Sequence, residues 1–338
     1  MGDNETELKA LVTGGGGFLG KAIVEMLIDN GVDVRTFSRS DYPELRKMGV
    51  NHIQGDIADA RAVSEAVEGC DIVYHTAAKA GVWGSYKSYY RPNVMGTENV
   101  IDACRIHDVP RLVYTSSPSV VYGEKPLRGV DETVDYPDTY LTAYPETKAI
   151  AEKKVLKADC NALRTTALRP HLIWGPGDNQ LVPRIVDRAR RGKLKKVGGG
   201  DAIVDSVYID DAARAHLLAA EALEGDAPAA GKVYFITAGE PAEVGELIDG
   251  IVTAAGLDPI DANVPAKVAY GVGWFLETIY KLFRRKQEPL MTRFVAKQLS
   301  TDHYFDISAA KQDLGYEPEY SIEEGMEELA KWLEYADI

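Results

Sequence analysis

A glycine run that follows a short apolar segment restricts the possible folds of this chain more than any other feature. Residues 8–12 are apolar and strand-like, residues 13–20 read Thr-Gly-Gly-Gly-Gly-Phe-Leu-Gly, and a helix-like stretch follows. A glycine-rich turn between a strand and a helix binds phosphate, because free backbone N–H groups and the helix dipole converge on an anion. The glycines match two dinucleotide-binding spacings, Gly15-x-Gly17-x-x-Gly20 and Gly14-x-x-Gly17-x-x-Gly20. They predict a dinucleotide site; the alternative is a loop that holds no ligand.

The first half of the chain alternates strand-like and helix-like segments. The expected strands are residues 8–12, 32–37, 52–54, 71–75 and 111–116, and the expected helices are 21–30, 61–67, 93–107 and one that starts near Tyr144. This alternation predicts an α/β fold with a doubly wound parallel sheet of the Rossmann type, which binds ligands at the carboxyl ends of its strands.

The pattern loosens after residue 170. A basic helix (182–191), a glycine turn (198–200), a strand (206–209) and a strand that rejoins the sheet (233–236) are expected there. We therefore predict a cofactor domain of residues 1–170 plus roughly 205–238. Residues 171–204 and 239–338 would form a smaller, mostly helical substrate lobe.

Composition narrows the class of protein. A net charge of −14 argues against nucleic-acid binding, which needs a basic surface. Three widely spaced cysteines favour a reducing cytoplasm, and the six histidines show no metal-ligand spacing, so no metal site is expected. Residues 1–6 lack the features of a secretory signal. They fit a loose myristoylation pattern, but an acidic, disordered tail explains them better.

The end of the second expected strand indicates which cofactor is bound. An NAD site usually has an acidic residue there, to hold the ribose 2′-hydroxyl. This chain has Ser38 and Arg39 instead, which can hydrogen-bond and pair with a 2′-phosphate. NADP(H) is therefore preferred over NAD(H), unless Arg39 is simply a surface arginine. Downstream, Asp56 can accept from the adenine amino group, and Ala77 and Ala78 are small enough for the ribose and nicotinamide to approach.

Tyr144 and Lys148 form the expected catalytic pair. A tyrosine has an ordinary pKa of about 10, so a cation must lower it before it can exchange protons near neutral pH. An ammonium about 4 Å away at an effective dielectric near 20 supplies roughly 4 kcal/mol, which is enough. Residues four apart share a helix face, so Lys148 can lie beneath the Tyr144 ring and reach the ribose hydroxyls.

With the glycines and the Tyr144/Lys148 pair, three further motifs carry a family resemblance: Thr115-Ser116-Ser117 before Val121-Tyr122-Gly123, Leu168-Arg169-Pro170, and Trp174-Gly175-Pro176-Gly177-Asp178. Together they resemble an extended short-chain dehydrogenase/reductase. Residues 75–84, 93–97, 289–293 and 314–318 resemble its 3β-hydroxysteroid dehydrogenase-like branch. That branch includes bacterial enzymes that reduce 2-alkyl-3-oxoalkanoates, and sterol 3-dehydrogenases.

The resemblance implies specific roles and a homodimer through the helices at 93–107 and 144–156. Tyr144 would be the general acid–base, Lys148 its electrostatic partner and Ser117 the donor to the substrate carbonyl. Ser119 and then Ser116 are the alternatives to Ser117, because counting back from Gly123 lands on Pro118, which cannot donate. Asn93 either anchors a water relay or caps the following helix. The expected cofactor contacts are Gly14, Gly17, Phe18, Leu19, Gly20, Ser38, Arg39, Asp56, Ile57, Ala77, Ala78, Lys79, Tyr144, Lys148 and Pro170.

One stretch of the expected substrate lobe, residues 264–286, combines an apolar helical stripe with a basic end. The stripe consists of Val268, Val272, Phe275, Ile279 and Leu282, thickened by Trp274, Leu276 and Phe283. Arg284-Arg285-Lys286 follow it. One interpretation is an amphipathic lid for a hydrophobic substrate, which contacts a membrane or a partner enzyme. The other is an ordinary core-facing helix whose dipole the cations complement.

These features favour a cytoplasmic NADPH-dependent reductase that converts a long-chain 3-oxoacid to its 3-hydroxyacid, with a possible peripheral membrane contact. The alternative is a 3β-hydroxysteroid or sterol dehydrogenase that works oxidatively. A sugar-nucleotide epimerase fits the apolar stripe less well. A dinucleotide sensor without catalysis fits least, because the chain keeps both Tyr144 and Lys148.

Overall fold

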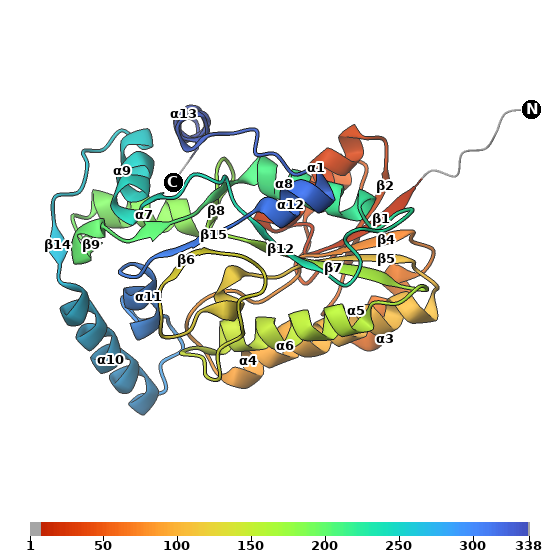
Figure 1. The fold of residues 1–338 in the computed structure, drawn as a ribbon, viewed down its shortest axis with the longest axis horizontal. Helices are drawn as coiled ribbons and strands as arrows, with labels where there is room; N and C mark the ends of the chain where they lie inside the picture. The colour runs from red at the N-terminus through yellow and green to blue at the C-terminus, as the bar shows by residue number, and fades with distance from the viewer. Residues whose placement is uncertain (1–7, 337–338) are drawn as a thin grey trace, which may run out of the picture.

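The computed structural model describes residues 8–336. The expectations for residues 1–6, a disordered tail or a myristoylation signal, lie outside this range. The centre of the protein is a seven-stranded parallel sheet in the order β12-β7-β5-β4-β1-β2-β3 (Figure 1). The strands are β1 (Lys9–Thr13), β2 (Asp33–Ser38), β3 (Asn51–Gln54), β4 (Ile72–His75), β5 (Arg111–Thr115), β7 (Arg164–Pro170) and β12 (Val233–Ile236). The predicted doubly wound parallel sheet is confirmed.

Helices cover both faces of this sheet (Figure 1). One layer consists of α1 (Phe18–Asp29), α8 (Ile209–Glu221) and α12 (Ser308–Leu314), and the other of α3 (Ala60–Val67), α5 (Gly96–Ile106) and α6 (Ala143–Ala158). Strands buried on both faces read as continuous apolar runs rather than as alternating ones. Ala10, Leu11 and Val12 of β1 are accordingly all fully buried, in cores on the two sides of the sheet.

The C-terminal lobe contains helices and a small mixed sheet. Its helices are α7 (Leu181–Arg190), α9 (Val244–Ala254), α10 (Ala266–Leu282), α11 (Arg293–Gln298) and α13 (Ile322–Leu333). Its sheet has the order β13-β10-β15-β6, with β13 (Ala242–Glu243), β10 (Ile203–Val204), β15 (His303–Phe305) and β6 (Leu127–Val130). Because β6 comes from the first half of the chain, this sheet joins the two lobes and brings α11 beside the loop after β5.

Short elements complete the described chain. They are α2 (Pro43–Lys47), α4 (Tyr86–Tyr90), a π-helical turn (Arg91–Met95), 3₁₀ turns (Pro118–Val121 and Gly198–Gly200), and the strand pairs β8 (Ile173–Trp174) with β11 (Val207–Tyr208) and β9 (Lys196–Val197) with β14 (Asn263–Val264). The strand expected at 206–209 is thus β11, which pairs with β8 rather than with the main sheet. β12 joins that sheet beside β7, as predicted. Within residues 8–336, no helix has the length and apolarity needed to span a membrane.

Candidate active site

A cleft opens at the carboxyl ends of β1, β2 and β4, where a doubly wound sheet binds its ligands. It is lined by Gly14, Gly17, Phe18, Leu19, Gly20, Phe37, Ser38, Arg39, Ser40, Tyr42, Gly55, Ile57, Thr76, Ala77, Ala78 and Pro92. This lining contains ten of the fifteen cofactor contacts expected from the sequence. These ten residues come from four separate segments of the chain, which the structure brings together in one cleft.

The glycine turn of this cleft has no room for side chains. A Cβ on Gly20 would lie 2.3 Å from the Gly14 carbonyl oxygen, and Gly14 itself has a φ of +74°. Gly17 precedes α1 without a side-chain cap, so backbone N–H groups of the first helical turn remain available to an anion. A close-packed turn with free donors fits the pyrophosphate of a dinucleotide.

Ser38 and Arg39 lie at the end of β2, on the wall of the cleft. The Ser38 hydroxyl oxygen is buried and has no hydrogen-bond partner within the described residues. A buried polar atom without a partner is costly, so its presence in a cleft points to a polar ligand group. Arg39 is exposed and forms no ion pair with the part of the chain that the structure describes. This pair fits a ribose that carries either a hydroxyl or a phosphate.

Three other residues that were expected to contact the cofactor lie outside the cleft lining: Asp56 and Lys79 bind other side chains, and Pro170 is buried. The Asp56 carboxylate accepts from Arg91 (2.9 Å) and from the Ala58 N–H (3.0 Å), and Asp56 does not belong to the cleft lining, whereas Ile57 does. Lys79 donates to the Ser88 hydroxyl (2.8 Å). Burial lowers the pKa of Lys79, and the nearby Arg39 lowers it further. Pro170 is buried at the end of β7. Contacts of these residues with a cofactor stay predictions.

Tyr144 and Lys148 lie near the start of α6, as the spacing predicts. Lys148 is only 2% exposed; its Nζ donates to the Thr115 carbonyl oxygen (2.5 Å) and lies 4.1 Å from the centre of the Tyr114 ring. Burial lowers the pKa of Lys148 to about 7, against the opposing effect of the Glu152 carboxylate. The ammonium thus engages the end of β5 rather than the Tyr144 ring.

The expected lowering of the Tyr144 pKa by Lys148 is wrong for this structure. Burial raises the pKa of Tyr144, because a phenolate is poorly solvated in the site, and a hydrogen bond with the Ser117 hydroxyl opposes this effect. The group that lowers the pKa of Tyr144 in this structure is therefore Ser117. From the sequence, Ser117 was expected only as a hydrogen-bond donor to the substrate.

The serines after β5 have distinct surroundings. Ser117 is partly exposed, and its hydroxyl lies 2.9 Å from the Ser119 hydroxyl. Ser119 is 4% exposed, and Ser116 is equally buried with an unpartnered hydroxyl. Of these three serines, only Ser117 is partly exposed and hydrogen-bonded to Tyr144, which favours the predicted order of Ser117 before Ser119.

Asn93 connects the cofactor side of the site to α6. It lies inside the π-helical turn, so the interpretation of Asn93 as a helix cap is wrong. Its amide donates to the Lys79 carbonyl oxygen (3.1 Å) and the Thr147 hydroxyl (3.0 Å), while its oxygen accepts from the Lys79 N–H (2.7 Å). Asn93 thus fixes the loop after β4 against the helix that holds Tyr144 and Lys148.

A buried ion pair that the sequence analysis missed fixes the same helix from the other side. Arg169 of β7 makes two hydrogen bonds to Glu152 of α6 (2.7 and 2.9 Å), and the Tyr136 hydroxyl donates to Glu152 (2.6 Å). Tyr144, Lys148 and Glu152 follow one another at four-residue spacing, a signal that could have placed Glu152 on the catalytic face.

A second, mostly apolar cavity lies beside Tyr144, between the two lobes. Its lining comes from the loop after β5, the start of α6, and α11 with the residues that follow it: Tyr122, Gly123, Lys125, Leu127, Leu141, Pro145, Phe294, Lys297, Gln298, Thr301, Asp302 and His303. Asp302 is paired with Arg128 (2.7 Å). Lys297 donates to the Gly123 carbonyl oxygen (2.6 Å) but makes no ion pair among residues 8–336. The position of α11 at this cavity was not predicted from the sequence, because this short helix lies far along the chain from Tyr144.

The arrangement can perform one kind of chemistry. Ser117 and Tyr144 form a hydroxyl pair that can give a carbonyl oxygen a hydrogen bond and a proton, and Pro145, which follows Tyr144 in the chain, lines the apolar cavity. The dinucleotide cleft lies at the ends of β1, β2 and β4. When bound, a nicotinamide dinucleotide supplies or accepts the hydride in such a site.

Comparison with known proteins agrees with this geometry. The model of the 3-beta hydroxysteroid dehydrogenase/isomerase family matches residues 11–265. The chain is 51% identical to a 2-alkyl-3-oxoalkanoate reductase of Stenotrophomonas maltophilia, over 95% of this chain and 98% of that protein. It is 36% identical to a 3 beta-hydroxysteroid dehydrogenase/Delta 5→4-isomerase of Mycobacterium tuberculosis, over 97% and 92% of the two chains.

Solved structures share the fold. MoeE5 in complex with UDP-glucuronic acid and NAD superposes with a TM-score of 0.76 at 25% identity, over 96% of this chain and 99% of that one. UDP-glucuronic acid 4-epimerase from Bacillus cereus, in complex with NAD, gives a TM-score of 0.75 at 21% identity, over 97% and 99%.

Proposed function

Because the chain belongs to the 3-beta hydroxysteroid dehydrogenase/isomerase family, we propose that it reduces the 3-oxo group of a long-chain 2-alkyl-3-oxoalkanoate with NADPH. The resemblance predicted from its motifs, to an extended short-chain dehydrogenase/reductase of this branch, is confirmed. An oxidoreductase that uses a nicotinamide dinucleotide is the class that the family and the cleft support. The substrate and the choice of NADPH are the proposed part.

The observation that supports an acid as substrate is the lysine in the apolar cavity. Lys297 is partly buried among Phe294, Leu141 and Pro145, and the carboxylate that shares this lining, Asp302, is held by Arg128. Burial lowers the pKa of Lys297, and only the nearby Glu124 opposes this effect. A substrate carboxylate would supply the missing partner. A neutral sterol would leave the cation unpaired.

The proposed reaction uses the residues in a fixed order. Ser117 donates a hydrogen bond to the carbonyl oxygen of the substrate. When bound, NADPH would supply the hydride that C3 receives as the C=O π bond breaks, and the Tyr144 hydroxyl would give its proton to the oxygen of that carbonyl. Lys148 holds the end of β5, from which Ser117 follows, through the Thr115 carbonyl oxygen. The product is a 2-alkyl-3-hydroxyalkanoate.

Arg39 and the unpartnered Ser38 hydroxyl support NADPH as the reductant, because both can bind a 2′-phosphate. NADPH in turn favours reduction over the oxidative reaction of a 3β-hydroxysteroid dehydrogenase. The homodimer through α5 and α6 and a cytoplasmic location remain part of the proposal.

The test measures NADPH oxidation by the wild-type enzyme with a long-chain 2-alkyl-3-oxoacid, a 3-ketosteroid and a UDP-sugar. Turnover of the oxoacid alone is the expected result; turnover of the steroid or the sugar in its place would overturn the proposal.

The role of Lys297 is tested with the oxoacid and its methyl ester, which has the same chain but no charge. In Lys297→Met, the KM for the acid should rise roughly tenfold or more while that for the ester stays unchanged, since hydrogen bonds to charged groups contribute about 1.5–3 kcal/mol. Lys125→Met is the matched control, because Lys125 lines the same cavity but is exposed. Equal changes in the KM for the acid and for the ester would show that Lys297 does not bind the substrate carboxylate. Such a result would not contradict the reductase function.

A further inference from the structure

The helix α10 packs on the rest of the protein through a narrow stripe of two small residues and one glutamate. Ala269, Gly273 and Glu277, at four-residue spacing, are its buried positions. A Cβ on Gly273 would lie 2.6 Å from the backbone carbon of Thr292, so the backbones of α10 and the start of α11 nearly touch. Glu277 accepts from Arg293 at the backbone N–H (2.7 Å) and at two side-chain nitrogens (2.8 and 3.0 Å). The helix is thus held firmly, by one face only.

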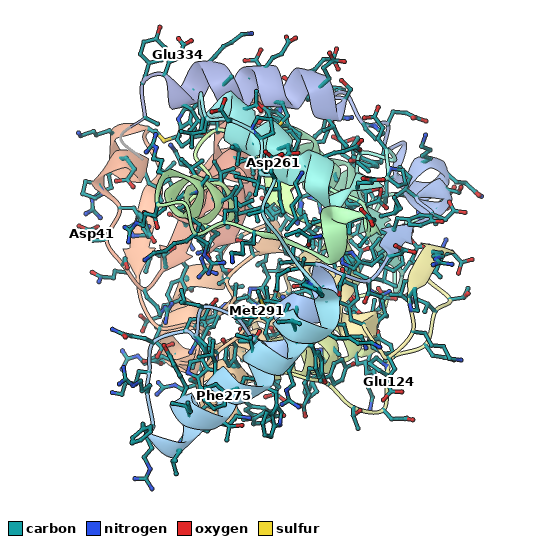
Figure 2. The ribbon with its side chains drawn as sticks, turned by 90° about the vertical axis from the view of Figure 1, so that its left-hand side faces the viewer. Asp41, Glu124, Asp261, Phe275, Met291 and Glu334 are labelled. Carbon is teal, nitrogen blue, oxygen red and sulfur yellow. The ribbon has the colours of Figure 1, made fainter. Side chains whose placement is uncertain are left out.

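The large apolar side chains of α10 point away from the protein. Phe275, Leu282 and Phe283 are 57%, 74% and 67% exposed, and Val268, Val272 and Trp274 are about half exposed. At 100° per residue, Val268, Val272, Phe275, Ile279, Leu282 and Phe283 fall on one stripe about 100° wide. We call these six residues the outer face of α10. Figure 2 looks onto this helix and labels Phe275 on it. The interpretation of this stripe as an ordinary core-facing helix is therefore wrong.

Exposed cations border the outer face. Lys267 and Lys281 lie on the helix, and Arg284, Arg285 and Lys286 follow its end. None of these five forms an ion pair with any other residue between 8 and 336. Five cations without an ion pair, of which Arg285 contacts the Tyr280 ring, thus lie beside one apolar surface on a chain with a net charge of −14. Their positive charge is complementary to an anionic surface rather than to the rest of this protein.

α11 packs against the buried side of α10, at Gly273 and Glu277, and contributes Phe294 and Lys297 to the lining of the apolar cavity. The helices α10 and α11 therefore both lie between the outer face and the cavity.

We propose that the outer face of α10 and its flanking cations dock the enzyme on the surface of an anionic membrane. The apolar and aromatic side chains would enter the boundary between headgroups and acyl chains, and the cations would contact acidic headgroups. Membrane binding of this kind does not depend on which substrate is reduced. A second copy of the chain is the less suitable occupant, because pairing two outer faces would bring ten unpaired cations together.

The test is co-sedimentation of the full-length protein with two kinds of vesicle, pure phosphatidylcholine and phosphatidylcholine with about 30% phosphatidylglycerol. The wild type should bind the anionic vesicles. Phe275→Ser/Leu282→Ser should weaken this binding at least about tenfold, because two large apolar side chains no longer enter the lipid. The control is Tyr335→Ser, which removes an 87% exposed apolar side chain outside α10 and should bind like the wild type.

Charge is tested separately with Arg284→Gln/Arg285→Gln/Lys286→Gln, which should abolish the preference for anionic vesicles. Thermal unfolding of each variant checks that the fold is kept. Absence of vesicle binding by the wild type, or equal binding by the outer-face variant and its control, would overturn the proposal. So would light scattering that showed a dimer in the wild type and a monomer in the outer-face variant, because the outer face would then be a contact between two copies.

Discussion

The hydroxyl oxygens of Ser117 and Ser119 lie 2.9 Å apart at the start of the 3₁₀ turn after β5. Ser117 is the partly exposed member of the pair and interacts with Tyr144, whereas Ser119 is buried behind it. Ser119 can therefore act on a substrate only by orienting Ser117. This relationship separates two residues that spacing alone left as alternatives.

Ser117→Ala should lower kcat roughly 100-fold or more, the usual effect of removing one donor to a developing oxyanion. Ser119→Ala should lower kcat less than about tenfold, because this change removes only the hydrogen bond that orients the Ser117 hydroxyl. Ser116→Ala is the control, since its buried hydroxyl has no partner to lose. Steady-state kinetics with NADPH measure all three. An inactive Ser119→Ala enzyme beside an active Ser117→Ala enzyme would reverse the assignment.

Six of the seven strands of the main sheet could be predicted from the sequence because their signals are local, and the glycines mark the first turn. The strand β7 was missed, because its sequence, Arg-Thr-Thr-Ala-Leu-Arg-Pro, is buried but is not an apolar run. The small sheet could not be predicted. Its strands have two to four residues, too few for a recognisable alternation, and the pairing of β6 with β15 joins segments more than 170 residues apart.

The candidate site was predictable where one motif lies on one element. Gly14, Gly17 and Gly20 share a turn, and Tyr144 and Lys148 share a helix. The direction of the Lys148 ammonium was not predictable, because its alternative partner, the Thr115 carbonyl oxygen, belongs to the backbone of another strand. Lys297 was missed for a related reason: only the tertiary fold brings α11 to Tyr122 and Pro145.

Arg39→Asp should raise the KM for NADPH roughly 100-fold and leave that for NADH within a few-fold. The change removes a charge-assisted contact with the 2′-phosphate and adds a carboxylate that repels it. Arg39→Lys should have an intermediate effect, since it keeps the charge but loses the planar fork. Kinetics with both cofactors at saturating substrate measure the difference. Equal losses with NADPH and NADH would mean that Arg39 does not contact the 2′-phosphate.

Gly20→Ala should weaken NADPH binding and lower the melting temperature, because the new Cβ would lie 2.3 Å from the Gly14 carbonyl oxygen. Backbone cannot move aside as a flexible side chain can, so the phosphate-binding turn must distort. Gly271→Ala is the matched control: it lies on the exposed side of α10 with no atom within 4 Å of the added Cβ. This change should stabilise the protein by up to about 1 kcal/mol. Thermal unfolding and NADPH fluorescence report both effects, and unimpaired binding by Gly20→Ala would contradict the proposed cradle.

The stability of the enzyme without cofactor should depend on the protonation of Lys148. Burial lowers the pKa of this ammonium to about 7 in the folded protein, from an unfolded value of 10.5. Between these values the unfolded chain binds a proton that the folded protein does not, so the free energy of unfolding rises with pH. Below about pH 7 both states are protonated, and the penalty for the buried charge is fully present.

Lys148→Met removes this dependence. Urea unfolding from about pH 6.5 to about pH 9.5 should show the free energy of the wild type rising relative to that of Lys148→Met. Lys157→Met, an exposed lysine on the same helix, should give a curve parallel to the wild type. A constant difference between the wild type and Lys148→Met across this range would show that the ammonium is not destabilised by burial. Lys148 would then remain fully charged at neutral pH, and its contact with Thr115 would have to compensate for the lost hydration.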